Sequence, residues 1–346
     1  MIKEQDFEIN EEGVLIKYTG VDTVIEIPQA IRGIAVRSIG EAAFAKNELI
    51  SVVIPNGVTE IGEAAFRGNE LTSIIIPNGV TKIDAFAFQS NELVNIIIPE
   101  SVTEIGAAAF DNNQLVSIDL PNSITEIGRF VFFKNQLTEV TVPESVTKID
   151  AAVFKENQLT NIIIPDGVTE IGDYAFKDNQ LVNVVIPKGV TKIGERAFQN
   201  NQLVNIVIPE SVTKIDKEAF QNNQLVNIVI PEGITKINDY AFADNQLVNV
   251  IIPGGVRVIG AAAFKNNQLA NIVIPDSVTE IWIGAFRNNQ LNSITILGKV
   301  SLPRATQGAA FDNGFDVFYK SNKKKSGTYL FDGTNWEYRK CPPAGL

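Results

Sequence analysis

Few residues of this chain could carry out chemistry. Histidine is absent from the 346 residues, and Cys341 is the only cysteine, so no internal disulfide can form. Imidazole catalysis, nucleophiles of the Ser-His-Asp and Cys-His types and histidine metal sites are therefore excluded. Carboxylates are numerous, but they do not converge in the sequence as a catalytic acid–base pair would. Only Asp119 and Glu139 offer a basis for such a pair.

The charge of the chain limits its partners. The formal net charge is −11, and the one basic run, Lys323–Lys325, is short enough to be a solvated turn. Nucleic acid is not an expected partner, because binding to its phosphates needs clustered lysine and arginine. The sequence has no phosphate-binding loop, no metal-ligand cluster and no apolar run near the ~20 residues of a membrane span. We therefore expect no cofactor, no metal, no membrane insertion and no enzymatic activity.

A spacing of 22 residues organises the chain. Phenylalanine recurs at Phe44, Phe66, Phe88, Phe110, Phe132, Phe154, Phe176, Phe198, Phe220, Phe242, Phe264 and Phe286. Proline recurs at Pro55, Pro77, Pro99, Pro121, Pro143, Pro165, Pro187, Pro209, Pro231, Pro253 and Pro275. A fixed period of this length predicts a solenoid, in which each coil buries its apolar face against its neighbours.

One coil, residues 203–224, shows how the repeat folds. Ile206 and Ile208 alternate with polar or outward positions, which predicts a short strand that Pro209 ends because proline has no N–H to donate. A second extended segment follows, with Val212 and Ile215 pointing inward. Stacked coils then form a parallel sheet along one side, and the phenylalanine column forms an aromatic spine. The stretch before each phenylalanine is too short for more than one helical turn.

Two further columns predict turns. The position after the second segment is Gly, Asp or Asn in every coil except the last, where it is Trp282. Gly, Asp and Asn tolerate positive φ, so we expect a left-handed turn at this position. An asparagine also keeps the period, at Asn47, Asn69, Asn91, Asn113, Asn135, Asn157, Asn179, Asn201, Asn223, Asn245, Asn267 and Asn289. We expect its amide to bond the backbone of its own turn and of the adjacent coil rather than to bind a ligand.

Both ends leave the repeat, as a solenoid must cover its open apolar ends. Residues 1–33 predict an N-terminal β cap with a hairpin around Glu11-Glu12-Gly13, and residues 34–297 predict the solenoid. Residues 298–346 predict a C-terminal cap: an Ala-Phe echo at Phe311, a β-hairpin around Asp332-Gly333 and a disordered tail from residue 339. We expect Trp282 to pack against this cap.

The pattern L-x-x-I-x-I-P-x-x-V-T-x-I-G-x-x-A-F, as in Leu71–Phe88 or Leu159–Phe176, resembles the BspA-like (Treponema pallidum-type) bacterial leucine-rich repeats over about residues 34–297. The segments Phe318-Tyr319 and Gly327–Trp336 resemble the short β tail that closes such arrays. The resemblance implies an α/β repeat fold: a right-handed leucine-rich-repeat solenoid of about 12 coils of 22 residues, with a parallel sheet on one face, short turns or helical turns opposite and small β caps at both ends. Many family coils have 23 residues and a cysteine or small residue after Ala-Phe, where this chain has 22 and Asn.

The resemblance also implies a location. Family members are typically cell-surface or secreted proteins that bind host proteins, other bacteria or matrix. The sequence from Met1 shows no charged-then-apolar leader, so a cytoplasmic protein and a mature chain without its leader both stay open.

Specificity can lie only in outward columns, since inward residues form the core. The outward positions of the first strand give an apolar column that Asp119 and Thr141 interrupt, beside Glu139; this polar notch is the best local candidate, although drift within a repeat explains it more readily. Phe133 replaces polar or charged residues of its column and is expected to be exposed. The candidate partner-binding residues are Ser117, Asp119, Phe133, Glu139, Thr141, Asn183, Val185, Asn205, Val207, Asn227 and Val229.

These features predict a non-enzymatic binding module, an adhesin-like bacterial protein that binds a host or bacterial surface protein through its strand face. The alternative is a structural scaffold whose apolar column pairs with another copy. An exposed apolar column of this length would mark a protein-binding surface, whereas β propensity and shielding by curvature would explain it without a partner. A monomer is favoured, and self-association stays open.

Overall fold

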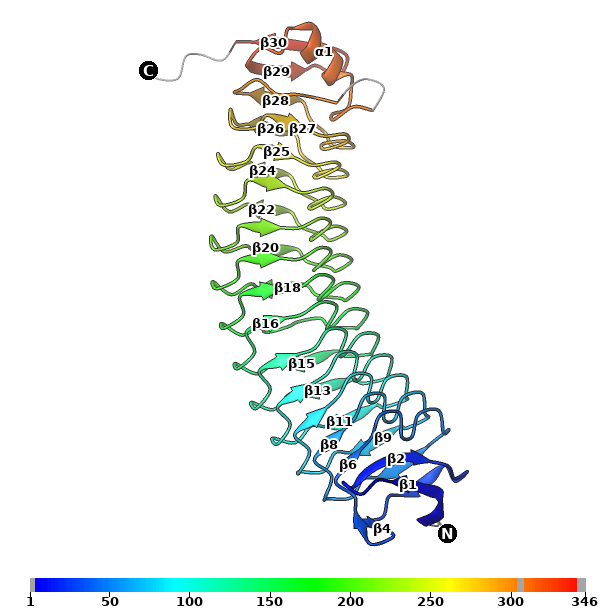
Figure 1. The fold of residues 1–346 in the computed structure, drawn as a ribbon. Helices are drawn as coiled ribbons and strands as arrows, with labels where there is room; N and C mark the ends of the chain where they lie inside the picture. Colours follow the sequence, from blue (N-terminus) through cyan, green and yellow to red (C-terminus); the bar gives the residue numbers. More distant parts are fainter. Residues whose placement is uncertain (1–3, 304–307, 341–346) are drawn as a thin grey trace. The chain divides into compact units, whose positions relative to one another are not determined.

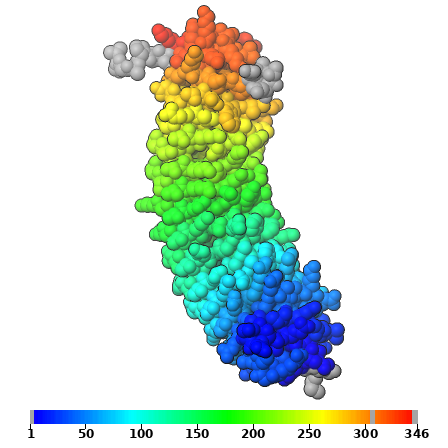
Figure 2. All heavy atoms as spheres, viewed as in Figure 1, coloured from blue at the N-terminus to red at the C-terminus, as the bar shows by residue number. Residues whose placement is uncertain are grey.

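The computed structural model describes residues 4–303 and 308–340. The chain divides into two compact units, Met1–Gln180 and Leu181–Leu346. In each unit the chain winds through successive coils that place short parallel strands above one another (Figure 1). The coils of each unit lie directly on one another in the space-filling view (Figure 2). The predicted solenoid fold with parallel strands is confirmed, and the described residues contain only one α-helix, α1.

The coils contribute short strands to two ladders, and the coil of Ile163 has a single bridge residue in place of a front strand. The front ladder contains the strands that precede the repeating proline, and the side ladder contains the two-residue strands that follow it. In the first unit the front ladder comprises β3 (Val24–Glu26), β7 (Ser51–Val53), β9 (Ser73–Ile75), β11 (Asn95–Ile97), β13 (Ser117–Asp119) and β15 (Glu139–Thr141). Its side ladder comprises β6 (Ser38–Ile39), β8 (Glu60–Ile61), β10 (Lys82–Ile83), β12 (Glu104–Ile105), β14 (Glu126–Ile127), β16 (Lys148–Ile149) and β17 (Glu170–Ile171).

The second unit repeats this arrangement. Its front ladder comprises β18 (Asn183–Val185), β20 (Asn205–Val207), β22 (Asn227–Val229), β24 (Asn249–Ile251), β26 (Asn271–Ile274) and β28 (Ser293–Ile296). Its side ladder comprises β19 (Lys192–Ile193), β21 (Lys214–Ile215), β23 (Lys236–Ile237), β25 (Val258–Ile259) and β27 (Glu280–Ile281). Paired residues of the second unit are 22 positions apart in both ladders, as Val258 and Glu280 show, so the sequence period is also the register of the sheet there.

The core follows the inward columns of the repeat. Ile206, Ile208 and Val212 are buried, and Phe220 is fully enclosed. The rings of Phe198 and Phe220 stack with their centroids 5.5 Å apart and their planes 3° from parallel. In the first unit Phe66 and Phe88 stack in the same way at 5.4 Å. The predicted aromatic spine is therefore present in both units, and each such pair adds about 0.5–1.5 kcal/mol beyond the burial of its area.

The asparagine column forms the predicted hydrogen-bond ladder. The Asn223 amide nitrogen donates to the carbonyl oxygens of Phe198 (2.9 Å) and Phe220 (3.2 Å). Its Oδ1 accepts the backbone N–H of Leu203 at 3.0 Å. The side chain is only 7% exposed, so one asparagine satisfies backbone groups of two coils away from water.

The left-handed turns do not lie where the sequence analysis placed them. No residue of the Gly/Asp/Asn column has a positive φ; positive φ falls two and six residues later, as at Ala108 and Asn112. Glycine is used in that column because the coils approach closely. A Cβ on Gly106 would lie 2.5 Å from the backbone nitrogen of Ala85.

The N-terminal end contains the expected hairpin. It comprises the 3-10 helix η1 (Glu4–Asp6), β1 (Phe7–Ile9), β2 (Val14–Tyr18), β4 (Ala30–Ile31) and β5 (Ile34–Ala35). The strands β1 and β2 pair antiparallel, and β2 then pairs with β6 of the side ladder. Tyr18 continues the aromatic spine by stacking on Phe44 with centroids 5.6 Å apart.

The C-terminal end contains the expected hairpin and one helix that the sequence analysis missed. These elements are α1 (Phe315–Ser321), β29 (Gly327–Phe331) and β30 (Trp336–Arg339). Phe311 stacks on Phe286 at 4.9 Å, as its Ala-Phe echo predicted. Phe318 and Tyr319 lie in α1 and not in a β tail, and Arg339 ends a strand. The rest of the predicted tail, with Cys341, lies outside the described residues, and the domain boundaries at residues 33/34 and 297/298 stay predictions.

Replacing Asn223 by alanine should lower the free energy of unfolding by about 1–3 kcal/mol, because the buried N–H of Leu203 loses its acceptor. Asn227→Ala, at an exposed front-ladder position outside the asparagine ladder, is the matched control and should change stability little. Urea unfolding followed by circular dichroism measures both. Equal stabilities of the two variants would contradict the ladder.

The second positive-φ column contains Gly68 (φ 69°) and, one coil earlier, Lys46 (φ 57°). A side chain in this conformation costs about 1 kcal/mol, so Gly68→Ala should destabilise the protein and Lys46→Gly should stabilise it by similar amounts. Thermal melting of the two variants tests the pair. Shifts of the same sign would show that the turn conformation is not the cause.

Candidate functional site

The front ladder of the first unit presents an apolar column to solvent. In each of its strands the middle residue is buried and the first and third residues point outward. The exposed fraction is 54% for Val53 and 83% for both Ile75 and Ile97. Ile163, which continues the column one coil after Thr141, is 75% exposed. The sheet therefore does not shield this column, and β propensity alone stays as the explanation without a partner.

The front ladder of the second unit is more uniform. Val185 and Val207 pair in register and are each 79% exposed, and Asn183 pairs with Asn205 beside them. Val229 and Ile251 continue the column, beside Asn227 and Asn249. The structure thus brings the predicted residues of β18, β20 and β22 onto one face, as parallel rows of amide and branched apolar side chains.

The predicted polar notch is a compact feature of the first unit. Ser117 pairs with Glu139 and Asp119 pairs with Thr141 across β13 and β15, and all four side chains are exposed. The buried residues between them are Ile118 and Val140. The notch offers two carboxylates and two hydroxyls to a ligand. Its carboxylates are open to solvent.

Phe133 was expected to be exposed, but it is half-buried. Its ring packs edge-on against Phe130 with centroids 5.9 Å apart, and the Lys155 ammonium lies 4.7 Å from its centroid. Phe130, 41% exposed, is the more accessible ring of the pair. Phe133 belongs to the turn before Asn135 and not to the front ladder. It therefore lies on a different part of the coil from the notch residues of β13 and β15. Contacts within the protein therefore cover much of the surface of the Phe133 side chain.

The repeat carries a family signature along most of the chain. The model of the BspA type leucine-rich repeat region, built of six copies, matches residues 37–160, 147–269, 196–316 and 257–342. This chain belongs to the BspA-type leucine-rich repeat family. No curated protein matches the chain.

Solved structures of bacterial leucine-rich repeat proteins share the fold. A leucine-rich repeat protein from Bacteroides ovatus has a TM-score of 0.63 at 22% identity, covering 85% of this chain and 88% of its own. A leucine-rich cell surface protein from Faecalibacterium prausnitzii has a TM-score of 0.58 at 29% identity, covering 88% and 95%. The pneumococcal vaccine antigen PcpA has a TM-score of 0.53 at 20% identity, covering 82% and 85%.

Two further findings on this BspA-type array concern metal ions and membranes. Among residues 4–303 and 308–340, no three acidic or cysteine side chains gather closely enough to hold a metal ion. In the same described part of the chain, no helix has the length and apolar character needed to cross a membrane.

The sequence analysis missed a second apolar row on the BspA-type repeat. Val94, Val116 and Val182, each just after the repeating leucine, are 38–40% exposed at the edge of the front ladder. They widen the apolar surface of each unit. The signal was present in the sequence, because this column holds valine in six of the twelve coils and isoleucine at Ile50.

A buried carboxylate was also missed. The Gln89 amide nitrogen donates to Asp111 Oδ2 at 2.5 Å, while Gln89 Oε1 and Asp111 Oδ1 are buried without a hydrogen-bond partner. Burial raises the pKa of the Asp111 carboxyl, and the hydrogen bond from Gln89 opposes this shift only in part. Asp111 therefore carries a cost when it is charged, and it lies one repeat before Phe133 in the same column.

Asp111→Asn should raise stability at neutral pH. Because the folded-state pKa of Asp111 is raised, its contribution to stability is fully present below the unfolded value of 3.8 and is lost as pH rises through the folded pKa. Asparagine keeps an acceptor for Gln89 without the charge, so the gain over wild type should shrink as pH falls toward 3.8. Melting temperatures between pH 3.5 and 7, with the exposed Asp119→Asn as control, measure this difference. A gain that is constant across this range would refute the assignment to a desolvated charge.

Proposed function

We propose that the chain is a non-enzymatic protein-binding module and that its front ladder is the contact surface. The observation that carries this proposal is the exposure of the apolar column: Val185, Val207 and Val229 remain between 67% and 79% exposed on consecutive strands. A monomeric protein seldom presents a contiguous apolar patch larger than a few hundred Å², and larger patches mark interaction sites. The rows of asparagine beside the column supply hydrogen bonds that orient a partner.

The proposed partner is a protein on a host or bacterial surface, and the proposed location of the chain is the cell surface or the exterior. The resemblance to a leucine-rich cell surface protein from Faecalibacterium prausnitzii supports this location. The polar notch of Ser117, Asp119, Glu139 and Thr141 is the proposed specificity element of the first unit, since it alone interrupts the apolar column there. The residues Asn183, Asn205 and Asn227, with the valines beside them, are the proposed contacts of the second unit.

Replacing Val185, Val207 and Val229 together by serine should abolish binding of the labelled chain to surface proteins, because it removes the exposed apolar column and leaves the buried core intact. The measurement is binding to epithelial and bacterial cells before and after the cells are treated with protease. Wild-type binding should be saturable and protease-sensitive.

The matched control replaces Lys188, Glu210 and Glu232 by serine in the same three coils; these exposed residues follow the repeating proline and lie off the front ladder. The control should bind as wild type does. Circular dichroism melts confirm that both triple variants fold. Equal binding by the wild type and the valine variant would exclude the front ladder, and no binding to any cell type would count against an adhesin-like role.

A self-assembling scaffold is the second candidate. The uniform register of the valine and asparagine rows in the second unit favours it, because identical rows on two copies can pack against each other. Light scattering over a concentration series separates the two functions. A mass that doubles with concentration in the wild type but not in the valine variant would support assembly through the front ladder, and a monomer throughout would leave the face free for a foreign protein.

A further inference from the structure

The last coils of the side ladder depart from the repeat at one place. Trp282 occupies the column that is otherwise Gly, Asp or Asn, and Ile283 follows it where the other coils have alanine or charged residues. One coil earlier, Val258 replaces the usual lysine or glutamate and pairs directly with Glu280. The other coils fold with different residues in these three columns. The fold of the coil therefore does not require Trp282, Ile283 or Val258.

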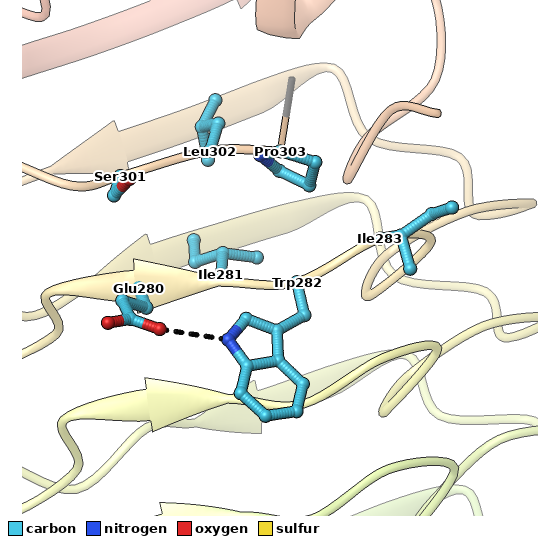
Figure 3. A pocket seen from close by; sticks show the side chains of 7 residues that line it. All are labelled: Glu280, Ile281, Trp282, Ile283, Ser301, Leu302 and Pro303. Carbon is cyan, nitrogen blue, oxygen red and sulfur yellow. Dashed lines mark hydrogen bonds between the residues drawn. The ribbon is translucent and has the colours of Figure 1, made fainter. Parts of the chain in front are cut away.

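The indole of Trp282 is held in a fixed orientation. Its Nε1 donates to Glu280 Oε2 at 3.0 Å, and the Lys236 ammonium lies 4.6 Å from the ring centroid. Figure 3 shows the ring pointing away from Ser301, Leu302 and Pro303, toward the preceding strands. The expectation that Trp282 packs against the C-terminal cap is therefore wrong, and closing the array does not explain this side chain.

A hollow lies beside this tryptophan. It has a volume of about 430 Å³ and is lined by Glu280, Ile281, Trp282, Ile283, Ser301, Leu302 and Pro303 (Figure 3). Trp282 is 36% exposed and Ile283 is 46% exposed, so large apolar surfaces stay open at its edge. Its polar groups, the Glu280 carboxylate and the Ser301 hydroxyl, belong to adjacent strand positions that pair in a parallel bridge. The volume falls within the range of small-molecule sites.

The chemistry of this surface favours a neutral, amphipathic ring. The face of an indole carries partial negative charge and attracts the C–H groups of an apolar ring face. The Glu280 carboxylate can bond hydroxyl groups at the edge of such a ring. Lys236 and Glu280 both contact the same indole and balance each other in charge, so neither an anion nor a cation is favoured.

We propose that the Trp282 hollow is a binding site for one ring of a neutral sugar, a pyranose that stacks on the indole and hydrogen-bonds to Glu280. This site lies on the side ladder and is independent of the front ladder. It would let the second unit engage a glycan while its front ladder engages a protein.

The test uses the full chain on a printed array of neutral hexopyranoside and N-acetylhexosamine glycans. Wild type should bind at least one glycan, and Trp282→Gly should weaken that binding about fivefold or more, since one ring contact contributes about 1 kcal/mol or more. The glycine variant restores the residue that the fold already uses at Gly260. Trp282→Asn, matching Asn238 in the same column, serves as a second variant if the glycine form melts early.

A spectroscopic measurement gives an independent readout. The only other tryptophan is Trp336, whose side chain is 8% exposed and whose Nε1 donates to the Asn313 carbonyl. In a Trp336→Phe background the bound glycan should shift the emission of Trp282 to shorter wavelength. Absence of glycan binding by wild type, or binding unchanged in Trp282→Gly, would overturn the proposal.

The outcome is separable from that of the proposed protein-binding function. The Val185, Val207 and Val229 serine variant should keep glycan binding, and Trp282→Gly should keep protease-sensitive cell binding. Glycan binding lost in the serine variant but kept in Trp282→Gly would show that the sugar contacts the front ladder instead, which would overturn the site proposed here.

Discussion

The structure depends on one constraint: every backbone group that a coil turns inward must find a partner without help from water. Strands satisfy only two short stretches of each coil. From Phe66 to Phe264 the turn that follows each phenylalanine is satisfied by a buried asparagine, whose amide donates to backbone carbonyl groups and whose oxygen accepts an N–H of the earlier coil, as Asn69 does for Phe44, Phe66 and Leu49. The phenylalanine stack and the isoleucine core can form only because this polar column closes the turns.

The inward columns were predictable from the sequence because burial and register leave little freedom. A 22-residue period places Phe220 under Phe242 and Asn223 under Asn245, and side-chain chemistry then decides what each column does. The location of the left-handed turns was not predictable in this way. Glycine, aspartate and asparagine tolerate a positive φ, but their presence in a column does not mean that the backbone adopts one there. Alanine and asparagine adopt positive φ at Ala108 and Asn112, while Gly106 serves close packing of the backbone.

The outward columns were only partly predictable. The pattern of β13 and β15 correctly brought Asp119 beside Thr141, because strand pairing follows the same register as the core. The surroundings of Phe133 and Trp282 depended on neighbours from other coils, Lys155 in one case and Lys236 in the other, and the residue types alone do not show which way these side chains turn. A departure from a repeat thus shows where to look, and only the structure shows which way the side chain turns.

The match between period and register has an evolutionary consequence. The stretches Gln202–Pro209 and Gln224–Pro231 are identical, and each occupies the same place in its coil. Unequal recombination between such stretches would add or remove one whole coil, and every strand, asparagine and phenylalanine would meet an equivalent neighbour afterwards. The front ladder can therefore gain or lose whole coils during evolution without requiring new packing contacts. The number of coils is then the property of the array most open to selection.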